Sequence, residues 1–161
     1  MRSVVTITKD IGRSDYVALI ETACERYPEF SVVWREQLHF DPSAQALQHE
    51  LRRFQVSRSR TDHWPGTRIV GSRGDVIRYT SRAAATGVLV RPRSLFGWLA
   101  PRFPEDLCFY ADDGSCAIIS VSHERGAWFC NHEWLRLLPK SADPEIERLS
   151  DESLHLLQPM A

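Results

Sequence analysis

The sequence predicts a single α+β domain with an antiparallel sheet, in which a β-meander in the C-terminal half is flanked by helices. Its 161 residues match the size of one ordinary domain. Segments with helical spacing of apolar residues are mixed irregularly with β-branched segments, which is typical of an α+β chain. Three short β-rich segments joined by tight turns, between 107 and 130, indicate the meander.

The first half of the chain is expected to supply two strands and two helices. SVVTITK near the N-terminus and FSVVWREQLHF at 30–40 are rich in β-type residues and predict the strands. A helix is expected over 15–26, with an apolar face formed by Val17, Leu19, Ile20, Ala23 and Cys24. A second helix is expected to start at Pro42 or Ser43.

The middle of the chain is expected to be less regular. VSRSRTDHWPGT at 56–67 is polar, lacks periodicity and ends in a Pro-Gly turn, so we interpret it as the longest loop. TRIVG and DVIRYT predict two strands around an SRG turn. RPRSLFGWLAP at 91–101 predicts a loop with one helical turn.

The meander is the clearest pattern of the second half. LCFYA, CAIISVS and AWFC are its predicted strands, joined by a DDG turn and an HERG turn. Its packed face is expected to hold Leu107, Phe109, Ile118, Val121 and Trp128. Asn131 suits the N-cap of a helix in HEWLRLLP. Residues 140–161 are acidic and are predicted to form a loosely packed tail, in which SLHLL is a candidate last turn.

The composition favours a cytoplasmic protein without a cofactor. Hydrophobic residues make up 43% and charged residues 25% of the chain, close to the averages for soluble proteins. No apolar run approaches the roughly 18 residues of a membrane helix, and the N-terminus lacks a signal-like apolar segment. The four cysteines lack the spacing of zinc or redox motifs and are expected to be reduced and buried: Cys24, Cys108, Cys116 and Cys130. Zinc held by mixed cysteine and histidine ligands is the alternative.

Charge is segregated along the chain although the net charge is only −1. Residues 1–51, 52–102 and 103–161 carry about −3, +9 and −7. The basic middle contains eleven arginines and two acids. It is expected either to be neutralised by the acidic thirds of the same chain or to face an acidic partner.

Two sets of residues are candidate partner-binding sites. The first lies in the expected long loop and comprises Arg58, Arg60, Asp62, His63 and Trp64. The second is an acidic alternative at the start and first turn of the meander, and comprises Glu105, Asp106, Asp112 and Asp113. Arginine and tryptophan often dominate binding energy at interfaces. A tryptophan that plugs the core, and carboxylates that flank a strand, are the structural alternatives.

No catalytic or metal-binding residue is predicted. His123 and Glu124 lie in the second turn of the meander, where a histidine beside a carboxylate can transfer protons. Neighbours on a strand point to opposite faces, however. Motifs of nucleophile elbows, P-loops and dinucleotide sites do not occur. An enzyme would therefore have to unite this pair with Asp62 and His63 in one pocket.

Several segments resemble a group of small bacterial proteins. They are WPGT at 64–67, SLFGWLAP at 94–101, and PEDLCFY…DDGS…VSHERGAW at 104–128. The PEDLCF…HERxAW hairpin is the most specific of these patterns. The resemblance covers the second half of the chain and implies no activity for any residue.

The leading hypothesis is a non-catalytic protein-binding module, in particular an immunity protein that neutralises a cognate bacterial toxin by direct binding. This is an analogy to a class of small bacterial proteins that need only complementary charge and a few aromatic anchors. The alternative is nucleic-acid binding through the arginine-rich segment 52–102, with Trp64, Tyr79 and Trp98 available for base stacking. The third hypothesis is a small hydrolase-type enzyme that uses Asp62/His63 and His123/Glu124.

Overall fold

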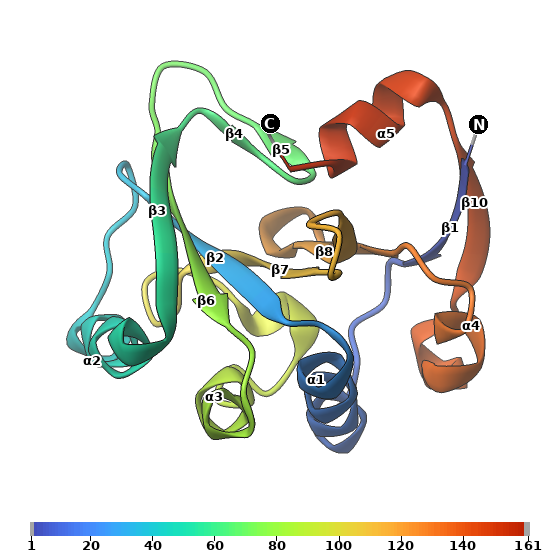
Figure 1. Ribbon diagram of the computed structural model, residues 1–161, viewed down its shortest axis with the longest axis horizontal. Coiled ribbons are helices and arrows are strands. Elements are labelled where there is room, and N and C mark those ends of the chain that lie inside the picture. The colour runs from blue at the N-terminus through green and yellow to red at the C-terminus, as the bar shows by residue number, and fades with distance from the viewer. Residues whose placement is uncertain (1, 160–161) are drawn as a thin grey trace.

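The computed structural model describes residues 2–159, which form a large antiparallel sheet with helices on both sides (Figure 1). The eight strands follow the order β10-β1-β9-β8-β7-β2-β6-β3, and every neighbouring pair is antiparallel. The predicted α+β class with an antiparallel sheet is therefore confirmed. The strands are β1 (Arg2–Ile7), β2 (Glu29–Arg35), β3 (Gln55–Thr61), β6 (Gly74–Thr80), β7 (Glu105–Tyr110), β8 (Cys116–Val121), β9 (Gly126–Phe129) and β10 (Glu145–Leu149).

The helices divide between the two sides of the sheet. Four lie on one side in Figure 1: α1 (Arg13–Arg26), α2 (Pro42–Leu51), α3 (Ala83–Leu89) and α4 (Trp134–Leu137). The other side carries α5 (Asp151–Leu157) and a small hairpin of β4 (His63–Trp64) and β5 (Thr67–Arg68). Short 3-10 turns occur at η1 (Arg52–Phe54), η2 (Leu95–Gly97), η3 (Ser122–Glu124) and η4 (Lys140–Ala142).

The central strands are buried on both faces because both sides of the sheet are covered. Every residue of β7 and β8 is buried. On the side of α1–α4, the ring of Phe30 packs against Tyr79 and Phe109, with centroids 5.2 and 6.0 Å apart. The opposite side has a smaller core of Val4, Cys108, Tyr110, Cys116, Ile119, Leu149 and Leu157. Burial on two faces explains why these segments are apolar runs rather than alternating patterns.

The predicted meander is present as β7, β8 and β9, and its packed face differs from the prediction at two residues, Val121 and Trp128. Leu107, Phe109 and Ile118 lie in the core under α1–α4. Val121 is buried on the opposite side of the sheet, where it faces Gly66 of the β4–β5 hairpin together with Ile119. Trp128 lies on the other face, since pairing of β8 with β9 places it beside Ile119 of the smaller core.

The prediction of a long loop at 56–67 is wrong. This segment contains most of β3 and then the β4–β5 hairpin. β3 is an edge strand exposed along almost its whole length, so it lacks the alternating apolar face on which strand prediction depends. TRIVG contributes only the two residues of β5, whereas DVIRYT forms most of β6.

The acidic tail is packed against the sheet through residue 157. β10 pairs with β1 over five residue pairs, and Leu149 and Leu157 are buried in the smaller core. The hydroxyl of Ser150 caps α5 by accepting the backbone N–H of Ser153 at 3.1 Å.

The first half of the chain follows the predicted order. α1 and α2 lie where helices were expected, and β2 ends at Arg35 rather than at residue 40. Asp41 caps α2 by accepting the N–H groups of Ser43 and Ala44.

Candidate functional site

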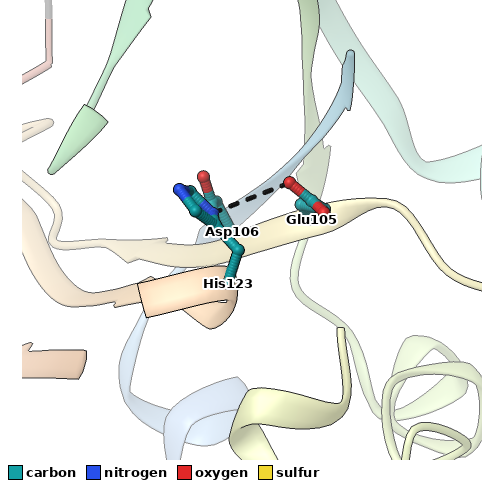
Figure 2. A group of neighbouring side chains, drawn as sticks. All are labelled: Glu105, Asp106 and His123. Carbon is teal, nitrogen blue, oxygen red and sulfur yellow. Dashed lines mark ion pairs between the residues drawn. The ribbon is translucent and has the colours of Figure 1, made fainter. Parts of the chain in front are cut away.

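A cluster of two buried carboxylates and one partly exposed imidazole lies at the start of β7 (Figure 2). Glu105 and Asp106 are only 4% and 2% exposed, and His123 approaches them from η3. Nδ1 of His123 lies 3.7 Å from a carboxylate oxygen of each acid. A buried charge is tolerated only when it is paired and hydrogen-bonded, so the partners of the two acids decide what the cluster can do.

Both oxygens of Asp106 have hydrogen-bond donors. Oδ2 accepts the indole N–H of Trp64 at 2.7 Å and the hydroxyl of Thr67 at 3.4 Å. Oδ1 accepts the backbone N–H of Ser122 at 3.0 Å and faces His123. The backbone of Asp106 has a φ of +57°, in a region that L residues other than Asn and Asp seldom adopt. The fold thus keeps an unfavourable backbone conformation at the residue that collects these donors.

Glu105 is held by two cationic side chains. Its Oε2 lies 3.3 Å from Nη1 of Arg35 and 3.7 Å from Nδ1 of His123. Burial, together with the adjacent Asp106, raises the pKa of Glu105 above its usual value. The carboxylate of Asp106 raises the pKa of His123 above 6.5. When all four groups are ionised, two negative and two positive charges balance within the cluster.

The cluster joins three segments that are distant in sequence. Trp64 and Thr67 come from the β4–β5 hairpin, Asp106 from β7, and Ser122 from the turn after β8. These residues lie in the WPGT, PED and VSHE segments of the sequence. Between the hairpin strands, Gly66 donates its N–H to the carbonyl of Leu156 at 2.6 Å, which ties the hairpin to α5. The three segments therefore form one connected structural unit.

The chemistry of this cluster favours anchoring over metal binding. One ligand atom from each of Glu105, Asp106 and His123 lies within 4.8 Å of the others, a spacing that could hold a cation. A metal ion would, however, have to displace a donor from Asp106 and would lie beside the guanidinium of Arg35. The arrangement instead fastens the β4–β5 hairpin to the meander.

A second feature is a cleft lined by arginines, which we call the arginine cleft. It has a volume of about 260 Å³, and residues of β2, β3 and β6 line it. The rings of Trp34 and Phe40 line it as well, edge to face with centroids 4.9 Å apart. Its charged lining is Arg35, Glu36, Arg58, Arg60, Arg73 and Asp75, so that four cations stand against two anions. Guanidinium groups beside aromatic rings suit the binding of carboxylate or phosphate.

The guanidinium groups of the two arginines on β3 form ion pairs with carboxylates of neighbouring parts of the same sheet. Arg58 pairs with Asp75 of β6, and Arg60 pairs with Glu36, just after β2. Both guanidinium-bearing side chains remain more than half exposed, at 55% and 61%. In the Arg60–Glu36 pair both partners are exposed, and such pairs contribute only about 0–1 kcal/mol, so an incoming anion can replace Glu36 at little cost. Asp75 is only 19% exposed, so replacing it costs more.

The opposite face of β3 lines a separate cavity of about 240 Å³. Its lining is mainly polar and includes Ser57, Ser59, Thr61, His63, Arg78 and Tyr110. The guanidinium of Arg78 stacks 3.8 Å above the ring of Tyr110 and pairs with Glu29 at 2.8 Å. Each face of β3 therefore borders its own cavity.

The structure separates the first set of predicted partner-binding residues. Arg58 and Arg60 line the arginine cleft, whereas Trp64 is buried against Asp106. Asp62 and His63 form a local pair with 2.6 Å between carboxylate and Nδ1, and this contact lowers the pKa of Asp62.

The acidic set is also divided. Glu105 and Asp106 are buried in the cluster, while Asp112 and Asp113 lie in the exposed β7–β8 turn. The carboxylate of Asp113 accepts the N–H and hydroxyl of Ser115 at 2.9 and 2.6 Å, which lowers its pKa.

The two histidine–acid pairs line different surfaces. The two cavities bordered by His63 are lined by neither His123 nor Glu124. The pairs are linked indirectly, through Trp64 and its hydrogen bond to Asp106. The single pocket that the hydrolase hypothesis requires is thus not formed by these two cavities.

Sequence reasoning missed the residues that complete the cleft and the cluster. Arg35 and Glu36 follow the buried run SVVW at the end of β2, and Asp75 is the second residue of β6, after Gly74. A charged pair directly after an apolar strand was the available signal. Nothing in the spacing indicated that Arg58, about twenty residues later, would share their cleft.

Comparisons of the chain with protein-family models, with curated proteins and with solved structures found no match. Within residues 2–159, none of the helices has both the length and the apolar character needed to cross a lipid bilayer.

Proposed function

We propose that this is a cytoplasmic, non-catalytic protein-binding module of the immunity type, which neutralises a cognate toxin by covering part of its surface. The observation that carries the proposal is the arginine cleft beside the edge strand β3. Arg58 and Arg60 project into it from β3, and Trp34 and Phe40 supply an aromatic wall. Arginine and tryptophan in a concave site are the residue types that most often anchor protein interfaces.

The charge of the cleft favours an acidic partner surface. Four guanidinium groups meet two carboxylates, and the pairs made by Arg58 and Arg60 are solvent-exposed. An acidic partner would compete most readily for Arg60, because its present acceptor, Glu36, is 40% exposed, whereas Asp75, the acceptor of Arg58, is only 19% exposed. Complementary charge of this kind increases the rate of association and selects among partners.

Nucleic-acid binding is the second candidate, and the same arginines favour it. Internal pairs reduce the charge available to phosphates, since Arg58, Arg60, Arg78 and Arg91 each contact a carboxylate of the same chain. Affinity for DNA or RNA would fall by orders of magnitude between about 50 and 200 mM salt. A protein complex with a packed aromatic centre would lose much less.

The test is co-expression with the product of the adjacent open reading frame in a bacterial host. We expect the neighbour alone to stop growth and the wild-type protein to restore it. The double variant Arg58→Glu/Arg60→Glu should fail to rescue, because it reverses the charge of the cleft. Arg148→Glu, a single charge reversal on the exposed opposite edge strand β10, is the control and should rescue. A harmless neighbour, or rescue by all three proteins, would contradict the proposal.

A further inference from the structure

We propose that the partner contributes an extended acidic segment, which adds to the sheet as a new strand along the outer edge of β3, on the side away from β6. This inference rests on the proposed protein-binding function and specifies its mode. In strand addition, main-chain hydrogen bonds supply affinity and pockets for alternate side chains supply specificity. β3 offers both elements.

The edge of β3 is long enough to accept a strand. Within residues 2–159, β3 pairs with β6 on one side and has no strand on the other. Its seven residues include no proline, and six of them are exposed. The register with β6 shifts between Gln55 and Ser57, after which residues 57–61 pair regularly. Five regular residues span about 17 Å, close to the usual length of a strand in a sheet.

The two faces of β3 favour different side chains in the added strand. Arg58 and Arg60 point to the arginine cleft, and Ser57, Ser59 and Thr61 point to the cavity on the other face. An added strand would place alternate side chains next to each cavity in turn. The cleft side favours Asp or Glu, because its lining is net positive. The other side, bordered by hydroxyl groups, favours small polar residues.

Charged residues on an edge strand usually serve to prevent such pairing. Arg58 and Arg60 are poorly placed for that purpose. Their side chains bond to Asp75 and Glu36, which lie on the side of β3 that faces the sheet. The outer edge of the backbone is therefore not screened by their guanidinium groups. Only an acidic strand would draw the guanidinium groups of Arg58 and Arg60 outward. The edge of β3 would therefore select acidic strands over neutral or basic ones.

The direct test uses a capped seven-residue peptide of alternating threonine and glutamate, titrated into the isotope-labelled full-length protein. We expect amide shift changes centred on residues 57–61 and slower hydrogen exchange at alternate residues of β3. A peptide with lysine in place of glutamate should produce neither effect. No shift at roughly 1 mM peptide, the upper range of weak binding, would overturn the inference.

Backbone methylation separates strand addition from simple charge attraction. Two further peptides carry N-methyl groups on all glutamates or on all threonines. A strand paired along one edge uses the N–H groups of every second residue, so one methylated peptide should lose binding at least tenfold and the other should retain it. Equal binding of both would mean charge attraction alone and would overturn strand addition.

The outcomes also separate this inference from the proposed function. If the neighbouring protein is neutralised through Arg58 and Arg60 but leaves hydrogen exchange of β3 unchanged, protein binding stands and strand addition is wrong. If the acidic peptide protects β3 and the neighbour is harmless, strand addition stands and the immunity role is wrong.

Discussion

The indole N–H of Trp64 donates to the buried carboxylate of Asp106 at 2.7 Å, and this bond fastens the β4–β5 hairpin to the central strand β7. The pair is separated by 42 positions in the chain. It connects the hairpin, which follows the edge strand β3, to the centre of the sheet. The position of the proposed binding edge therefore depends on a buried anchor that does not itself contact the partner.

Replacing Trp64 with Phe should destabilise the protein by about 1–3 kcal/mol, because one oxygen of Asp106 loses its closest donor. Thr67→Val removes a much longer contact, at 3.4 Å, to the same oxygen and should cost less. Urea unfolding of the two variants measures the difference. Equal losses would mean that the indole bond is not the main attachment of the hairpin.

Asp106→Asn should lower the unfolding free energy by about 3 kcal/mol, because it leaves His123 and the indole donor without their anionic partner. The backbone conformation is not the cause, since Asn accepts a φ of +57° as readily as Asp. The measurement is chemical denaturation near pH 6, where His123 is charged. A neutral effect would show that the cluster makes little net contribution to stability.

Stability should fall as pH rises through the folded-state pKa of His123. Its pKa is raised above 6.5 by Asp106, so the folded state binds the proton more tightly than the unfolded state. The stabilisation from protonated His123 is complete below pH 6.5, and it is lost as the pH rises through the raised pKa of His123 in the folded state. Glu105 acts with the same sign in a lower range, because its pKa is raised above 4.5. Unfolding free energies at pH 6 and pH 8.5 test this, and His123→Gln should remove the difference contributed by this residue.

Gly66→Ala should be destabilising by about 2–4 kcal/mol, since it combines a left-handed backbone with crowding of the core. Gly66 has a φ of +84°, and an added Cβ would lie 2.7 Å from Cγ2 of Val121. Gly114→Ala is the matched control, because its φ is +81° but no atom lies within 4 Å. Thermal unfolding should show a clearly smaller loss for the control. Similar losses would mean that the hairpin has room to move away from β8.

Local patterns predicted the meander, α1 and α2, because their core residues recur at the spacing of one strand or helix face. They did not predict β3, since an edge strand exposed on both faces needs no apolar alternation. The sequence predicts Trp64 and His63 as partner-binding residues because tryptophan in a polar segment resembles an interface anchor. Only the fold reveals that Trp64 bonds to Asp106, and that Arg35 and Glu36 join Arg58 in one cleft. These relationships depend on long-range strand pairing, which local spacing does not encode.

The measurement that tests the central claim most directly is titration calorimetry of the purified neighbouring protein against wild type, Arg60→Glu and Arg148→Glu at physiological salt. The two variants carry the same charge change on opposite edges of the sheet, β3 and β10. We expect Arg60→Glu to weaken binding about tenfold or more, as the loss of a charge-assisted contact does, and Arg148→Glu to leave the affinity unchanged. Equal affinities for all three proteins, or a loss confined to Arg148→Glu, would contradict binding at the arginine cleft.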